Sequence, residues 1–238
     1  MPFAQSSYDL KCEWGLEGLR ALRSHAEVVV VVDVLSFSTA VDIAVSRGAF
    51  AFPYRWRDET AAGYAQEKGA ILAGGRRSGL QYTLSPVSLM AVPSGTRLVL
   101  PSPNGSTLSL EASGVPLFTA CLRNAPAVAR AAAKKGARIA VIAAGERWRG
   151  GELRPCLEDL LGAGAVLSEL PGTRSPEAEM AVAVFARFRN ELPAALAQCG
   201  SGRELLEKGV GDVEVAAEYA VSSAAPMLDR EGKFARDE

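Results

Sequence analysis

Three carboxylates in this sequence stand where they could act on a bound anion: Asp33, Glu158 and Asp159. Asp33 ends the valine run of EVVVVVDVLSFST, whereas Glu158 and Asp159 open the helical pattern EDLLGAGAV. Carboxylates from different loops, together with a substrate phosphate, are the oxygen ligands that Mg²⁺ usually takes in proteins. First-turn capping is the competing explanation for Glu158 and Asp159, because an acid there also favours the helix dipole.

Two loops rich in hydroxyl and amide side chains accompany these acids. They contain Ser38 and Thr39 in DVLSFST, and Asn104, Gly105, Ser106 and Thr107 in PSPNGST. Each loop precedes a predicted helix, whose free N–H groups and positive dipole end suit a phosphate or sulfonate. Ser, Thr and Asn are also preferred N-cap residues, so helix capping is the alternative for both loops.

A third polar loop, CLRNAP, contains Arg123 and Asn124. A guanidinium group can hold an anionic substrate through two parallel hydrogen bonds. A charge that simply faces solvent is the alternative for Arg123.

The surrounding pattern predicts the elements that position these loops. The β-branched run Val28–Val32 is typical of a central strand buried on both faces, and TAVDIAVSRGA predicts a helix that ends near Gly48. The order of strand, polar loop and helix recurs from Leu98 and from Ile139. Alternating strands and helices predict a three-layer α/β/α fold with a mainly parallel sheet. The recurrence lies in the elements rather than the residues, and indicates at most an internal duplication of Rossmann-like units.

Ligands of open α/β sheets bind beyond the carboxyl ends of the strands. This rule selects four loops that should converge: Asp33–Thr39, Pro101–Thr107, Cys121–Pro126 and Ala143–Asp159.

The C-terminal third carries no recognisable chemistry. The sequence after Ser175 is helical, with breaks near Pro193 and near Gly200 and Gly202. It is interpreted as a structural cover or as the subunit interface of a homo-oligomer. The last residues of the mixed segment that ends at Leu228 are expected to be exposed.

Composition limits the classes of function. The chain has 238 residues and a net charge of −1, so no basic field favours nucleic acid as a partner. Apolar runs are well short of the ~20 residues that a membrane helix needs, and the N-terminus has no secretory pattern. These features predict a cytoplasmic protein with one α/β domain over residues 1–238, or two closely packed lobes.

Several catalytic classes are disfavoured. The single histidine, His25, precedes the valine run, at the wrong end of that strand for an α/β site and thus for a Ser-His-Asp triad. The four cysteines are widely spaced, without a CxxC pair. A haloacid-dehalogenase-type phosphatase needs a second acid where this chain has Leu35, and no GxGxxG follows a strand.

Six segments, in order from about Val28 to about Leu170, read VVVVDVLSFSTAV, SPVSL, PSPNGSTLSL, CLRNAPAVA, IAVIAAG and LEDLLGAGAV. Together they resemble one family, the 2-phosphosulfolactate phosphatases. The resemblance implies an Mg²⁺-dependent α/β/α enzyme that removes phosphate from 2-phospho-3-sulfolactate. The product would be 3-sulfolactate, on a route to coenzyme M.

The resemblance, read with the loops above, suggests roles for the polar residues. Asp33 and Asp159 are the predicted catalytic residues, and Asp33, Glu158 and Asp159 the predicted Mg²⁺ ligands. The residues predicted to hold the small anionic substrate are Ser38, Thr39, Asn104, Gly105, Ser106, Thr107, Arg123 and Asn124.

Three positions depart from the family pattern. Ser36 stands where the family usually has arginine, Gly75 where it has an acid, and Gly162 where it has cysteine. A phosphocysteine at the last position is therefore impossible, whereas Arg76, Arg77 and Arg123 are candidates to compensate for the lost arginine and glutamate. The departures motivate an alternative: a catalytically impaired relative that binds a phosphorylated or sulfonated metabolite. A phosphatase with a shifted substrate is a third hypothesis.

Overall fold

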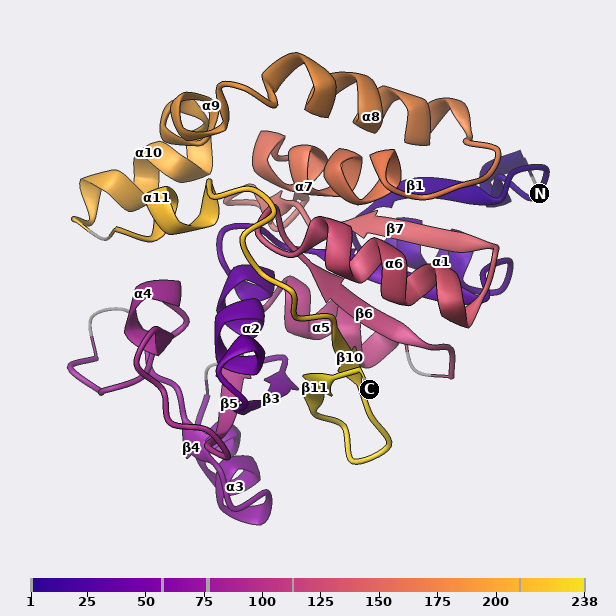
Figure 1. Ribbon diagram of the computed structural model, residues 1–238. Coiled ribbons are helices and arrows are strands. Elements are labelled where there is room, and N and C mark those ends of the chain that lie inside the picture. Colours follow the sequence, from indigo (N-terminus) through magenta and orange to yellow (C-terminus); the bar gives the residue numbers. More distant parts are fainter. Residues whose placement is uncertain (1, 57, 76–77, 113, 210, 238) are drawn as a thin grey trace.

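The computed structural model describes residues 2–56, 58–75, 78–112, 114–209 and 211–237 (Figure 1). The strands are β1 Leu10–Trp14, β2 Val28–Val32, β3 Phe50–Tyr54, β4 Ile71–Leu72, β5 Arg97–Pro101, β6 Leu117–Ala120, β7 Ile139–Ala143, β8 Glu146–Arg147, β9 Leu153–Arg154, β10 Pro226–Leu228 and β11 Phe234–Arg236. The helices are η1 Pro2–Ala4, α1 Gly15–Arg23, α2 Phe37–Ser46, α3 Thr60–Glu67, α4 Pro86–Leu89, α5 Gly105–Glu111, α6 Ala125–Lys135, α7 Leu157–Ser168, α8 Pro176–Phe188, α9 Leu192–Gln198, α10 Gly200–Glu207 and α11 Asp212–Ala216.

Within the described residues, nine strands form one sheet in the order β1-β7-β2-β6-β10-β11-β3-β5-β4. The first four strands are mutually parallel, and so are β3, β5 and β4. The antiparallel β10–β11 hairpin, yellow in Figure 1, joins these two groups. The predicted α/β fold with a mainly parallel sheet is confirmed, whereas the internal duplication and the two-lobe organisation stay predictions.

The valine run forms the central strand β2, and all five of its side chains are fully buried. Successive side chains of a strand point to opposite faces. Val28, Val30 and Val32 accordingly pack with residues of α6 and α7, whereas Val29 and Val31 pack with residues of α1, α2 and α5. Helices on both faces make three layers and exclude water from the strand, which explains the unbroken β-branched run.

The sequence pattern did not predict the structure of either terminal segment. The N-terminal segment, for which the pattern makes no prediction, forms β1 and α1, and β1 pairs with β7 at the sheet edge. The expectation of exposed residues near Leu228 is wrong, because β10 pairs with β6 through Met227 and Phe118, and Pro226 is buried. Pairing with distant strands overrides the weak local pattern of both segments.

Helix α8 lies alongside α7 on its outer side, and α9 to α11 lie at one end of this pair (Figure 1). A Cβ atom at Gly164 of α7 would lie 2.1 Å from the carbonyl oxygen of Ala181 in α8, so glycine permits this close helix packing. Pro193 stands in the first turn of α9 rather than at a helix end, as suits its missing N–H group.

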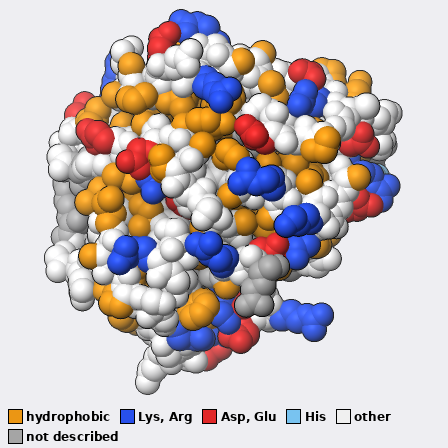
Figure 2. Space-filling model, viewed as in Figure 1, with side chains coloured by type: hydrophobic (Ala, Val, Ile, Leu, Met, Phe, Trp, Pro, Cys, Tyr) orange, Lys and Arg blue, Asp and Glu red, His pale blue; other side chains and the backbone are white. Residues whose placement is uncertain are grey.

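The face seen in Figure 2 intersperses Lys and Arg with Asp and Glu side chains. None of the helices in the described part of the chain combines the length and the apolar character needed to cross a membrane.

Candidate active site

Asp33 follows strand β2 directly, and its side chain is buried. Its carboxylate oxygens accept hydrogen bonds from the backbone N–H groups of Phe37, at 3.3 Å, and Gly105, at 2.8 Å. A Cβ atom at Gly105 would lie 2.8 Å from Asp33 Oδ2 and 2.3 Å from Phe37 Cδ1, so this approach requires glycine. The loops after β2 and β5 therefore meet at Asp33.

The environment of Asp33 favours its protonated form. Burial raises the pKa of Asp33 to about 7, and the negative charge of Glu146 adds to the shift. The N–H groups of Gly105 and Phe37 act in the opposite direction, because they stabilise the carboxylate. The Asp33 carboxyl therefore exchanges its proton near neutral pH, where an ordinary aspartate is fully ionised.

Asp159 lies in the first turn of α7 and joins two further loops. Its Oδ1 accepts a hydrogen bond from the N–H of Val34 at 2.7 Å, and its Oδ2 accepts one from Gly145 at 2.8 Å. Burial, followed by the charges of Asp33 and Glu158, holds the pKa of Asp159 well above its usual range. Asp159 thus ties the loop after β2 to the loop after β7, and the charge of Asp33 acts on it.

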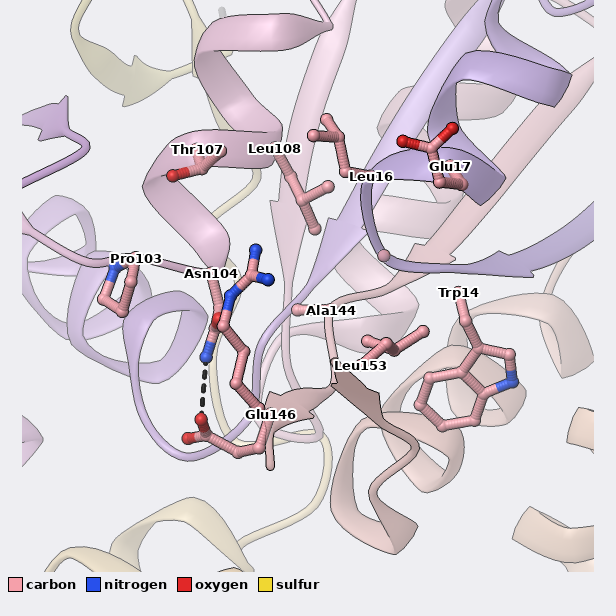
Figure 3. Close-up of a pocket in the computed structure, with 12 residues that line it drawn as sticks. Trp14, Leu16, Glu17, Pro103, Asn104, Thr107, Leu108, Ala144, Glu146 and Leu153 are labelled. Atoms are coloured by element: carbon pink, nitrogen blue, oxygen red, sulfur yellow. Dashed lines mark hydrogen bonds between the residues drawn. The ribbon is translucent and has the colours of Figure 1, made fainter. Parts of the chain in front are cut away.

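Glu146 is a site residue that the sequence pattern did not single out. It begins β8, three residues after β7 ends, and its Oε2 accepts a hydrogen bond from Asn104 Nδ2 at 2.9 Å (Figure 3). Burial raises the pKa of Glu146, and the charge of Glu158 adds to the shift. The available signal was its position as the first acid after strand β7, in AAGERW.

A cavity of ≈ 400 Å³ opens at Asp33, and we call it the Asp33 pocket. Its lining residues are Asp33, Leu35, Ser36, Arg55, Trp56, Leu84, Ser102, Pro103, Asn104 and Glu146. Arg55 is the single cation among these described lining residues, and its Nη2 also contacts Glu111 at 3.3 Å. The pocket therefore places two carboxylates with raised pKa values in the same cavity as one guanidinium group.

The hydroxyl groups of Ser38, Thr39 and Ser106 form hydrogen bonds within the protein. Ser38 Oγ accepts a hydrogen bond from the backbone N–H of Asp33 at 2.9 Å and bonds to the hydroxyl of Thr119 at 2.7 Å. Thr39 Oγ1 and Ser106 Oγ donate to backbone carbonyl oxygens, at 2.7 and 2.8 Å. All three side chains are fully buried, so they fix the strand ends and neither cap a helix nor line the Asp33 pocket. Their predicted contact with substrate stays a prediction.

The PSPNGST loop contributes to the site in three ways. Asn104 lines the Asp33 pocket and bonds to Glu146, and Gly105 donates to Asp33. Thr107 lines an adjacent cavity, and its buried hydroxyl has no hydrogen-bond partner in the described part of the chain.

Arg123 and Asn124 lie outside the lining of the Asp33 pocket. Arg123 Nε donates to the fully buried carboxylate of Asp42 at 3.0 Å, and the guanidinium group also pairs with Glu218. Asn124 Oδ1 accepts a hydrogen bond from the N–H of Cys121 at 2.8 Å, while its buried Nδ2 lacks a partner among the described residues. The solvent-facing alternative for Arg123 is wrong, and its predicted grip on substrate stays a prediction.

Glu158 is buried beside Asp159 but does not line the Asp33 pocket. The Cys199 thiol donates to the carbonyl oxygen of Leu196 at 3.1 Å, and burial, followed by the charge of Glu158, raises the pKa of that thiol to about 12. Glu158 affects the site through its negative charge, which adds to burial in raising the pKa values of Asp33 and Asp159.

The positions that depart from the family pattern have distinct surroundings. Ser36 lines the Asp33 pocket, and the carbonyl of Gly75 accepts a hydrogen bond from Ser78 N–H at 2.9 Å. A Cβ atom at Gly162 would lie 2.7 Å from Val32 Cγ1, so glycine allows α7 to approach β2. Arg76 and Arg77, two of the three candidates for compensation, lie outside the described residues.

The fold and this site define a class of protein: an α/β enzyme with an acidic pocket at the carboxyl ends of its strands. A family model described as 2-phosphosulpholactate phosphatase matches residues 17–231. A protein of Gloeobacter violaceus (strain ATCC 29082 / PCC 7421), named "Probable 2-phosphosulfolactate phosphatase", is 31% identical over 218 residues, which cover 87% of this chain and 90% of that relative.

The chain therefore belongs to the 2-phosphosulpholactate phosphatase family, and the resemblance found in its motifs is confirmed. It is a phosphatase, a phosphoric monoester hydrolase. The enzymes of this family act on a small phosphorylated substrate.

Proposed function

We propose that the Asp33 pocket hydrolyses 2-phosphosulfolactate, or a similar small phosphorylated acid, with the help of Mg²⁺. The observation that carries the proposal is the pairing of Asp33 and Glu146 in one open cavity with Arg55. Raised pKa values at Asp33 and Glu146 indicate charge that the protein leaves poorly neutralised, as is common at catalytic sites. The name of the Gloeobacter relative supports the choice of substrate.

The donor chemistry of the pocket suits a hard divalent cation. Both Asp33 and Glu146 offer carboxylate oxygens, and a cation would offset the charge of Glu146, which adds to burial in raising the pKa of Asp33. No three His, Cys, Asp or Glu side chains among the described residues are arranged to hold a metal ion. Mg²⁺ is commonly held by one or two carboxylates, waters and substrate phosphate, so this pair meets its ordinary requirement.

The ligand set that the sequence predicts also includes Glu158 and Asp159. We propose that these two residues do not contact the metal but affect the pocket electrostatically, by adding negative charge near Asp33. Asp159 would in addition keep the loops after β2 and β7 in register through its two backbone hydrogen bonds.

Hydrolysis transfers the phosphoryl group from the ester oxygen to water, and the alcohol leaves with a proton. When bound, the metal would polarise a phosphoryl oxygen. Asp33, which lines the cavity, would accept the proton of the attacking water. Arg55 would hold a non-reacting anionic group, and the hydrogen bonds from Phe37 and Gly105 would keep the Asp33 carboxylate in place.

The test is phosphate release from 2-phosphosulfolactate and other small phosphorylated acids, with and without Mg²⁺. Asp33→Asn is expected to lower kcat by about 10²–10⁴-fold, the usual value of a positioned acid or base. Asp229→Asn, in the β10–β11 turn, is the control and should keep wild-type activity. An active Asp33→Asn variant would contradict the assignment of Asp33.

The same assay decides the alternative that Ser36 and Gly75 motivate, a relative that binds a phosphorylated or sulfonated metabolite without turnover. Robust phosphate release by the wild-type protein rejects it. The cytoplasmic location, the role on a route to coenzyme M and the homo-oligomer stay predictions from the sequence.

A further inference from the structure

A second cavity, of ≈ 220 Å³, adjoins the Asp33 pocket (Figure 3). The two cavities share Pro103, Asn104 and Glu146 as lining residues. The hydrogen bond between Asn104 and Glu146 belongs to this shared wall, and Figure 3 shows it at the edge of the second cavity. A ligand whose reacting group lies at Asp33 could therefore extend into the second cavity.

The walls of the second cavity are mainly apolar. Trp14 ends β1, Leu16 lies in the first turn of α1, Leu108 in α5 and Leu153 in β9, while Ala144 directly follows β7. Figure 3 shows these side chains around a common space. The charged lining residues are one glutamate of α1, Glu146 and its neighbour Arg147. Such walls favour an uncharged apolar group over an ion, which would lose its hydration there.

Backbone conformation builds this cavity. Gly15 and Gly145 have positive φ angles of 58° and 67°, a region that non-glycine residues rarely adopt. Cβ atoms at these positions would lie 3.1 and 2.8 Å from Leu153 Cδ1. The two glycines thus let the loop after β7 and the start of α1 approach Leu153, which closes one side of the cavity.

We propose that the second cavity binds an uncharged apolar arm of a phosphorylated 2-hydroxy acid whose ester lies at Asp33. This inference rests on the proposed function. A closed apolar cavity of about 150 Å³ can bind benzene, so a branched alkyl or phenyl arm fits the available space. The charged sulfonate arm of 2-phosphosulfolactate would instead remain in the wider Asp33 pocket with Arg55.

The experiment compares phosphate esters that share a carboxylate but differ in the arm. Phosphoglycolate has no arm, 2-phospholactate has a methyl group, and the 2-phosphate esters of 4-methyl-2-hydroxypentanoate and phenyllactate have larger apolar arms. A well-placed methylene in an apolar pocket changes kcat/KM by roughly 10–200-fold. We expect kcat/KM of the full chain with Mg²⁺ to rise at least tenfold from phosphoglycolate to the 4-methylpentanoate ester.

Leu153→Trp fills the second cavity, and Leu206→Trp is its control, because both leucines are 39% exposed and Leu206 lines neither cavity. Leu153→Trp should lower kcat/KM for the 4-methylpentanoate ester about tenfold and leave phosphoglycolate within about twofold. Leu206→Trp should change neither. Equal effects of Leu153→Trp on both esters, or equal wild-type kcat/KM along the series, would overturn the inference.

Binding separates this inference from the proposed function. Calorimetric titration of the same esters into EDTA-treated protein measures affinity without turnover. Arm-dependent affinity in a protein that releases no phosphate keeps the apolar site and rejects the phosphatase assignment of the Asp33 pocket. Affinity that is independent of the arm rejects the apolar site, whatever the activity.

Discussion

Asp33 should destabilise the metal-free protein at neutral and alkaline pH. Its pKa is about 7 in the folded chain, against 3.8 for an ordinary aspartate in water, the value expected in the unfolded chain. The folded protein thus binds more protons than the unfolded chain between these values, so its stability falls as pH rises through that window. Asp33→Asn removes the titrating group and nearly keeps its shape, and the fall should disappear with it.

The size of the effect follows from the pKa shift. Between pH 5 and pH 7, the free energy of unfolding of wild type should fall by about 2 kcal/mol relative to that of Asp33→Asn. The amide of the variant has one acceptor oxygen where the carboxylate has two, so the N–H of either Gly105 or Phe37 loses its acceptor. This loss lowers stability by about 1–3 kcal/mol. This second cost is the same at every pH, and the difference between two pH values isolates the charge.

Thermal unfolding in EDTA at pH 5 and pH 8 provides the assay. For a chain of this size the gap in Tm between Asp33→Asn and wild type should widen by roughly 5–10 °C from pH 5 to pH 8. Asp9→Asn is the control, because hydrogen bonds from Thr173 lower the pKa of Asp9, so this group titrates below the window and its Tm gap should stay constant from pH 5 to pH 8. A Tm gap that is constant with pH would refute the account of Asp33 as a buried, poorly neutralised carboxyl.

Three further predictions test other parts of the structure. The thiols of Cys121 and Cys199, with pKa values that burial raises to about 12, should not react with a disulfide reagent at pH 8 until the protein unfolds. Gly162→Cys should lower stability by about 1–3 kcal/mol in denaturant titrations, because its Cβ collides with strand β2. Arg123→Ala leaves the buried Asp42 without its main cation and should cost about 3–5 kcal/mol, with KM changed less than twofold if Arg123 does not touch substrate.

The rule that ligands of open α/β sheets bind beyond the carboxyl ends of the strands located much of the site from sequence. Asp33 and Asn104 line the same pocket, and Gly105 contacts Asp33, because the loops that follow β2 and β5 meet. The rule could not decide which hydroxyls face the cavity. Ser38 and Ser106 turn inward because buried backbone groups at the strand ends need partners, a demand invisible in a list of loop residues.

Glu146 and Arg55 are site residues that the sequence did not predict. Neither belongs to a recognisable motif, and each enters the pocket because a distant element lies across from it. Glu146 meets Asn104 from a strand 42 residues further along the chain, and Arg55 is paired by Glu111 of α5. Such pairings depend on loop paths, which local propensity leaves open.

The sequence alone determined the class of fold, the burial of the central strand and the position of its terminal carboxylate. Periodicity and composition suffice for these properties, because they reflect how each segment meets water. Tertiary structure decided the pKa of Asp33, the partners of its oxygens and the second cavity beside it. Those properties depend on burial and on charges from distant segments, and both exist only after the chain has folded.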